Sequence, residues 1–436
     1  MKLSGRALVG LDEFMLRIGH LRVLAHVAAQ LGGSRSKTER FAAEFLRDSI
    51  QVPAAAHIAE YLGLKRLCPV KGKDDHLSTN ERRVNFRYPD ITIVDEAGHF
   101  RFQGEARSVS LMWQDAQLAH PRVPSRVGAI TTEAKSGSKT GLSHIFDWAI
   151  GLDLISQSSQ AGPLARVFSS GTDSSSALPF SNPYIPGPEI LPAAFLSVGA
   201  DADVFARLVR RLNSSANFPL KKREAAVLFA SVVEEIDSES LRANYLTTSQ
   251  RFKLSSLLRD LKRSARTSRT NLGETSTAWH RTASRLESYV DFGLLKKGVS
   301  SEKEKYEYIY YRTERLALVA GQIESATTIE EWIGSSLTYL VSDQQPQSRR
   351  YTAAEFTTIL KTAVEAIKSP TSVLPLDALT LYTMETALRA NRPAPYGDTR
   401  AQLEQFARDN EHVARLARGR SGRGAEFLTI NIRALQ

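Results

Sequence analysis

Three stretches in the first third of the chain alternate apolar and polar residues, as half-buried β-strands do. They cover residues 88–94, 99–107 and 129–135. Residues 95–98, Asp-Glu-Ala-Gly, are typical of a hairpin turn between the first two stretches. The pattern predicts a small mixed sheet.

Most of the remaining chain places apolar residues at helical spacing, so we expect an α+β protein that is mainly helical. The N-terminal helix should end at Gly32 and Gly33, and the helices before the strands should pack against the sheet. The predicted helices include residues 8–31, 141–155, 203–212, 221–236, 276–290, 377–390 and 399–418.

The composition changes abruptly to Ser, Gly and Pro over residues 158–192, which predicts a linker or surface loop and the main domain boundary. The predicted organisation is an N-terminal helical segment (1–80), an α/β core (81–157), the linker (158–192), a helical domain (193–330) and a C-terminal helical domain (331–436).

Composition narrows the class of protein. A chain of 436 residues with 42% hydrophobic and 24% charged residues fits a soluble globular protein of several domains. The single cysteine, Cys68, excludes internal disulfides and a four-thiolate zinc site, and it suits the cytoplasm. No run of eighteen apolar residues is present, so no membrane partner is expected. The net charge of +10 favours a polyanionic partner such as nucleic acid.

Carboxylates fall on the polar faces of all three predicted strands. In the first strand Asp90 lies on the face opposite to Ile91 and Ile93. Glu105 lies on the polar face of the second strand, and Glu133 shares a face with Lys135 in the third. Two carboxylates a few ångströms apart are unfavourable unless a hard cation lies between them, and Mg²⁺ prefers oxygen ligands.

These residues resemble the PD-(D/E)xK nuclease superfamily, with Pro89-Asp90 as the PD and Glu133-Ala134-Lys135 as the ExK. The resemblance implies that Asp90 and Glu133 ligate Mg²⁺. It also implies that Lys135 orients or activates the water that attacks a phosphodiester.

The chain departs from the family pattern in two respects. The gap from Asp90 to Glu133 is long, and Glu105-Ala106-Arg107 lies at a more usual distance but has arginine in place of lysine. We therefore assign Glu105 as an auxiliary acid. The alternative is an ordinary sheet whose solvent face is charged.

A basic segment follows in the second half of the chain, with Asp260 as its one acid. Such a run is either a solvated helix face or an electrostatic footprint for phosphates. Its basic residues are Arg251, Lys253, Arg259, Lys262, Arg263, Arg266 and Arg269.

Residues 276–312 resemble the recognition helix and wing of winged-helix domains: an amphipathic helix, a Gly-Leu-Leu turn and an alternating run. The resemblance implies that Arg281 and Arg285 on the polar face of the helix reach bases in the major groove. Lys296 and Lys297 would contact phosphates.

The C-terminal region shows a fainter version of this pattern. Arg415, Arg418, Arg420 and Arg423 lie among glycines just before the apolar strand predicted at residues 427–432. This region is either a second winged helix with an arginine-rich wing or a basic turn before a terminal strand.

Two function classes follow. The first is a DNA-binding protein with an Mg²⁺-dependent endonuclease core, of the restriction or phage-defence type. The second is a non-catalytic winged-helix DNA-binding regulator or assembly subunit. Duplex DNA is the expected partner in both, and a homodimer or a larger defence complex is the expected assembly. Convergence of Asp90, Glu133 and Lys135 would separate the two classes.

Overall fold

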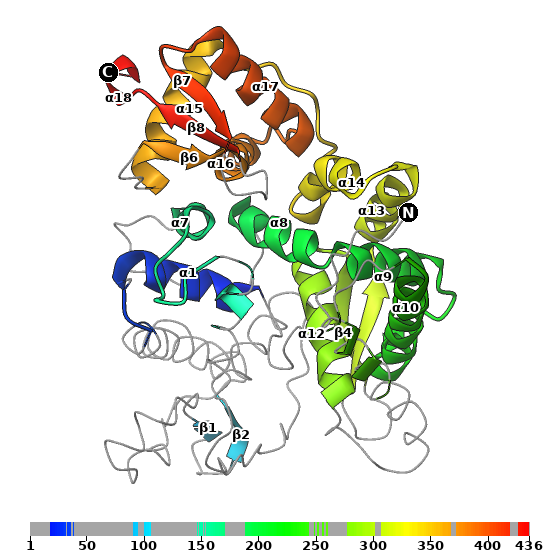
Figure 1. Ribbon diagram of the computed structural model, residues 1–436. Helices are drawn as coiled ribbons and strands as arrows, with labels where there is room; N and C mark the ends of the chain where they lie inside the picture. Colours follow the sequence, from blue (N-terminus) through cyan, green and yellow to red (C-terminus); the bar gives the residue numbers. More distant parts are fainter. Residues whose placement is uncertain are drawn as a thin grey trace.

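The computed structural model describes residues 18–38, 90–105, 146–170, 188–259, 277–300, 307–367, 372–418 and 426–435, with gaps in the first four ranges. Within these residues the protein is mainly helical and carries three small antiparallel sheets (Figure 1). The expected class, α+β and mainly helical, is confirmed for this part of the chain.

A first unit combines three helices with a three-stranded sheet. Its sheet has the order β3-β5-β4, so the strand that follows the first helix pairs with the last strand. The elements are α9 (Ala202–Ser214), β3 (Leu220–Lys221), α10 (Lys222–Ala243), α12 (Thr277–Asp291), β4 (Leu295–Ser300) and β5 (Glu307–Arg312).

A second unit repeats this order of elements and this strand order, β6-β8-β7. In each unit the first strand leads directly into a helix, so Leu220 and Leu374 occupy equivalent places two residues before that helix begins. The elements are α15 (Ala353–Ile367), β6 (Val373–Pro375), α16 (Leu376–Arg389), α17 (Tyr396–Asp409), β7 (Ala414–Arg418) and β8 (Glu426–Ile430), followed by α18 (Ile432–Leu435).

Further helices surround and connect the two units. The helix α1 packs against α7, and α7 also contacts α8, α15 and α16. Figure 1 shows α7 and α8 between α1 and the second unit. These elements are α1 (Gly19–Leu31), α7 (Pro163–Ser170), η3 (Pro188–Ile190), α8 (Leu191–Ala200), α13 (Glu314–Ser325), α14 (Ile329–Ser336) and η5 (Leu337–Leu340).

Two apolar cores hold the described residues together. The larger lies in the first unit and the surrounding helices, where Phe205 stacks on Trp332 with ring centroids 5.7 Å apart, and it also takes in Leu381, Met384 and Leu388 of α16. The smaller fills the second unit. The helix α7 contributes Ala165 and Phe168 to the larger core and Val167 to the smaller one. The prediction of a linker is therefore wrong for residues 163–170, because their apolar residues form a buried helix.

Two other predictions need correction. Residues 410–418 do not continue the predicted helix: α17 ends at Asp409, and Ala414 and Leu416 alternate with more exposed positions along β7. The N-terminal helix ends at Leu31 as expected, just before Gly33 at φ +113°. It packs on α7, whereas we expected it to pack on the sheet of residues 88–135.

The strands β1 (Asp90–Val94) and β2 (Phe100–Glu105) form the expected antiparallel hairpin. Its register sets Asp90 directly opposite Glu105 and Ile93 opposite Phe102, which agrees with the predicted parity. The third predicted strand, residues 129–135, lies outside the described residues.

Candidate nucleic-acid interface

The outer face of the first unit's sheet presents a cation beside an aromatic ring. Lys296 on β4 is exposed and pairs across the strands with Tyr311, whose exposed fraction is 41%. Directly opposite residues in an antiparallel pair lie on the same side of the sheet. The other side of this sheet faces the core, where Tyr310 and Leu220 are buried. The side of Lys296 is therefore open to a ligand.

The second unit has a basic residue at the same place. Leu220 pairs with Tyr310 and Tyr310 with Lys297, while Leu374 pairs with Leu428 and Leu428 with Leu416. Because these registers match, Lys297 on β4 and Leu416 on β7 occupy equivalent places. The residues that precede them are therefore equivalent as well. Those residues are Lys296 and Arg415, and both are exposed.

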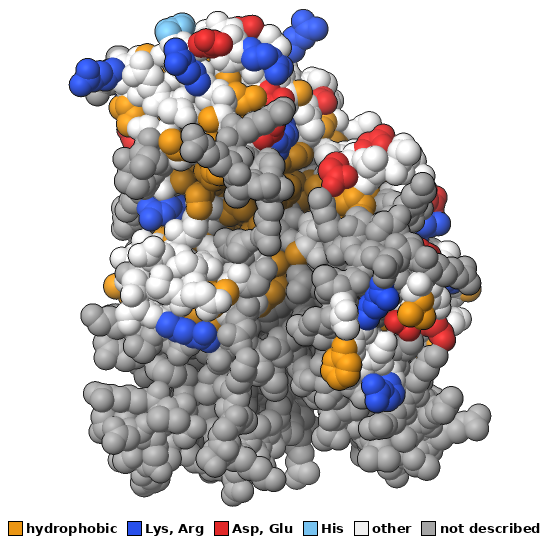
Figure 2. All heavy atoms as spheres, in the orientation of Figure 1, with side chains coloured by type: hydrophobic (Ala, Val, Ile, Leu, Met, Phe, Trp, Pro, Cys, Tyr) orange, Lys and Arg blue, Asp and Glu red, His pale blue; other side chains and the backbone are white. Residues whose placement is uncertain are grey.

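More cations surround Arg415. Arg408 and Arg433 are exposed, and the Arg408 guanidinium donates only to the Gln405 side chain among the described residues. Figure 2 shows basic side chains interspersed with acidic ones at the upper end of the molecule, over the second unit. This region is less uniformly positive than the sequence suggested.

The structure contradicts the DNA-contacting role predicted for Arg285. The side chain is 5% exposed, is ion-paired with Asp201, and lies over the Phe229 ring at 4.8 Å. Burial lowers the pKa of Arg285 to about 10, so the guanidinium remains charged at neutral pH. Arg285 is a structural residue of the interior.

Its neighbours on the second half of α12 are buried as well. Glu287 accepts a hydrogen bond of 2.7 Å from Tyr310 Oη. The Asp291 carboxylate accepts one of 2.7 Å from the backbone N–H of Ile18, at the start of α1. Because α10 and β4 pack against α12 and the side chains of its second half are buried, this half cannot enter a DNA groove.

The remaining cations predicted to contact DNA are described fully, only as backbone, or not at all. Arg251 is partly exposed and Arg259 exposed on helical turns. The backbones of Arg281, Lys297 and Arg418 lie in α12, β4 and β7, but their side chains are not described. Outside the described residues altogether are Lys253, Lys262, Arg263, Arg266, Arg269, Arg420 and Arg423.

Of the predicted acids, only Asp90 and Glu105 lie in the described residues, and they occupy opposite positions at the open end of the hairpin. Glu133 and Lys135 lie outside them. Among the residues that the structure describes, no cluster of three or more metal-ligating side chains is present.

No family model, curated protein or solved structure matches this chain. In the described part of the chain, none of the helices has the length and apolar character needed to cross a membrane.

Proposed function

We propose that the first and second units are two winged-helix modules and that the protein binds duplex DNA through the outer faces of their sheets. The observation that carries this proposal is the equivalence of Lys296 and Arg415, two exposed cations at the same place in a repeated topology. Cations placed in this way contact phosphates rather than bases, so binding would depend on salt more than on sequence.

The helices of the two modules are poor candidates for reading bases. The second half of α12 is enclosed, and the exposed face of α17 carries Asp398 and Asp409. Arg400 on α17 is already paired with Asp377, Glu404 and Glu426. The sheets therefore supply the exposed cations that occupy equivalent places in the two modules, and the net charge of +10 supports such a partner.

The proposal is tested by the salt dependence of affinity for a labelled 30-base-pair duplex. Each phosphate contact contributes about 0.9 to the slope of log affinity against log salt. The double variant Lys296→Gln and Arg415→Gln should therefore lower the slope by about 1.8. Arg210→Gln with Lys361→Gln is the matched control, because both are exposed cations on α9 and α15. Equal slopes for the two double variants would contradict the proposal.

We also propose, as a second function, Mg²⁺-dependent cleavage of the bound DNA. The specific observation is the β1–β2 register, which sets Asp90 opposite Glu105 at one end of a hairpin, and carboxylates are the kind of ligand that Mg²⁺ prefers. When bound, the metal would stabilise charge on the phosphate and lower the pKa of its bound water. Glu133 and Lys135 retain the roles that the nuclease resemblance implies.

Cleavage is tested with supercoiled plasmid in Mg²⁺ or Mn²⁺. Nicking should appear, be abolished by a chelator, and be lost in Glu105→Gln, in Glu133→Gln and in Lys135→Ala. Asp95→Asn, in the turn between the two strands, is the control and should leave nicking intact. Intact plasmid with the wild-type protein would leave DNA binding as the function and reject catalysis.

A further inference from the structure

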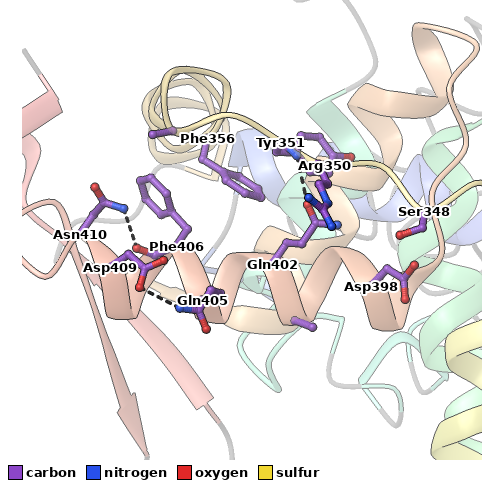
Figure 3. A pocket seen from close by; sticks show the side chains of 12 residues that line it. Ser348, Arg350, Tyr351, Phe356, Asp398, Gln402, Gln405, Phe406, Asp409 and Asn410 are labelled. Atoms are coloured by element: carbon purple, nitrogen blue, oxygen red, sulfur yellow. Dashed lines mark hydrogen bonds between the residues drawn. The ribbon is translucent and has the colours of Figure 1, made fainter.

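A groove of about 530 Å³ runs along the exposed face of α17 in the second unit. One wall is the extended segment 348–352 with the start of α15, and the other is α17 (Figure 3). Arg415 is not among its lining residues, although the Arg415 side chain donates to the Glu411 carbonyl just beyond the end of α17. Its lining residues include Tyr351, Phe356, Asp398, Gln402, Phe406 and Asp409.

The middle of the groove is aromatic. The ring of Phe356 lies 4.8 Å from that of Tyr351 and 5.3 Å from that of Phe406, measured between centroids. Figure 3 shows Phe356 and Phe406 packed side by side, so their rings form the floor of the groove. An aromatic or large apolar side chain would gain favourable contacts there.

The two ends of the groove are acidic. Asp398 and Asp409 are eleven residues apart (409 − 398), about three helical turns, so they share one face of α17 about 16 Å apart along its axis. Figure 3 shows them at opposite ends of the helix. Within the described residues neither carboxylate forms an ion pair, although Asp409 accepts a hydrogen bond of 2.8 Å from Gln405 Nε2.

The charge of the lining is opposite to that of the chain. Arg350 also lines the groove, so its one positive charge against two carboxylates leaves a net charge of −1, whereas the whole chain carries +10. Asp409 also lies in the last turn of α17, where the helix dipole is negative and a cation would be stabilised. The groove therefore favours a cationic ligand over a nucleic acid.

One wall of the groove already shows how α17 holds an extended chain. Gln402 Oε1 accepts from the backbone N–H of Tyr351 at 3.1 Å, and Gln402 Nε2 donates to the carbonyl of Arg349. A side-chain amide that pairs with the peptide groups on both sides of Arg350 fixes this segment beside the helix. The groove lies between this segment and the exposed face of α17.

We propose that the groove binds an extended segment of a partner protein that carries two basic residues with an aromatic residue between them. The spacing follows from the two carboxylates and from strand parity. Side chains on one side of an extended chain recur every second residue, so basic residues four apart span about 13 Å at about 3.3 Å each, and their long side chains cover the remaining distance to about 16 Å. The basic residues would pair with Asp398 and Asp409, and the aromatic ring would contact Phe356 and Phe406.

The test uses a fluorescein-labelled peptide, acetyl-Lys-Ser-Phe-Ser-Lys-amide, and the full chain. We expect it to bind at least about fivefold more tightly than a peptide of the same composition with adjacent lysines, or one with glutamates in their place. The variant Asp398→Asn with Asp409→Asn should remove this preference. Glu411→Gln, an exposed carboxylate close to the end of α17 that does not line the groove, should not change it. Equal binding of all three peptides, no measurable binding, or a preference that persists in the double variant would overturn the proposal.

DNA binding by the same double variant separates this inference from the proposed function. The salt slope for the labelled duplex should be unchanged, because the two substitutions remove no cation and so remove no phosphate contact. A weaker or flatter DNA response in the variant would assign α17 to DNA and overturn the peptide proposal. A lower salt slope in the Lys296 and Arg415 variant, with the wild-type slope kept in the Asp398 and Asp409 variant, would support both proposals.

Discussion

Arg285 and Arg415 show how burial decides what an arginine does. Both lie in the basic regions of the sequence, but Arg285 is enclosed with Asp201 while Arg415 is exposed. A buried charge is stable only with its partner, because desolvation is costly without one. An exposed guanidinium has no such requirement and remains free to contact a phosphate.

Asp201→Asn should therefore destabilise the fold strongly. Removing one partner of a buried ion pair typically costs about 3–5 kcal/mol, because the remaining charge stays buried. Asp343→Asn is the matched control: it also breaks an arginine pair, with Arg315, but the Asp343 side chain is 85% exposed. The control should cost about 1 kcal/mol or less. Urea denaturation measures both, and similar losses for the two variants would contradict this role for Asp201.

At the scale of elements, α14 and α15 each begin at a threonine whose cap involves a glutamate three residues later. Thr352 Oγ1 accepts from the backbone N–H of Glu355 at 3.2 Å, and the Glu355 carboxylate accepts from the backbone N–H of Thr352 at 2.8 Å. Thr328 and Glu331 repeat half of this arrangement at α14, where the Glu331 carboxylate accepts from Thr327. Both starts match the capping-box pattern, Thr followed three residues later by Glu.

The cap at α15 predicts a pH dependence. The hydrogen bond from the Thr352 backbone holds the pKa of Glu355 below its usual value. Its contribution to stability is therefore present above the unfolded-state pKa of about 4.3 and is lost as the pH falls through the lower folded-state value. Glu355→Ala should cost about 1 kcal/mol at pH 7, and the difference from wild type should shrink on acidification. Glu365→Ala, exposed on the same helix, is the control, and thermal unfolding at several pH values is the measurement.

Local patterns predicted the elements but not their surroundings. The apolar spacing of Leu286 and Val290 correctly placed α12, and the alternating run at residues 306–312 correctly placed β5. The enclosure of Arg285 depends on Asp201, which is 84 residues away in the sequence, and on the Phe229 ring of α10. No local period carries information about such a contact. Lys296 was predicted as a surface cation, whereas its equivalence to Arg415 required the pairing registers of both sheets.

At the scale of the whole molecule, α7 joins the two cores. Phe168 is fully buried in the larger core and Val167 in the smaller, so neighbouring residues of one helix pack in opposite directions. The composition of residues 158–192 concealed this helix, because its apolar residues are few and are flanked by serine and glycine.

Phe168→Ala should therefore weaken the whole protein. Truncating a buried phenylalanine typically costs about 3–5 kcal/mol through lost contacts and the cavity left behind. Because α7 packs against the second unit and Phe168 belongs to the core that extends into the first, we expect fluorescence from the first unit and hydrogen exchange in the second to report the same loss. Gln157→Ala, exposed in the turn before α7, should leave both signals unchanged. A loss confined to the first unit would show that α7 does not couple the two.

The position of α7 also determines how the chain can be divided for study. The serine- and proline-rich stretch at residues 171–187 is an obvious place to cut the gene, yet a fragment that begins after it would leave α7 behind. The apolar surfaces of α15 and α16 that α7 covers would then face water, and such patches promote aggregation. A fragment intended to carry the second unit alone should therefore bring residues 163–170 with it, either fused or added as a separate peptide.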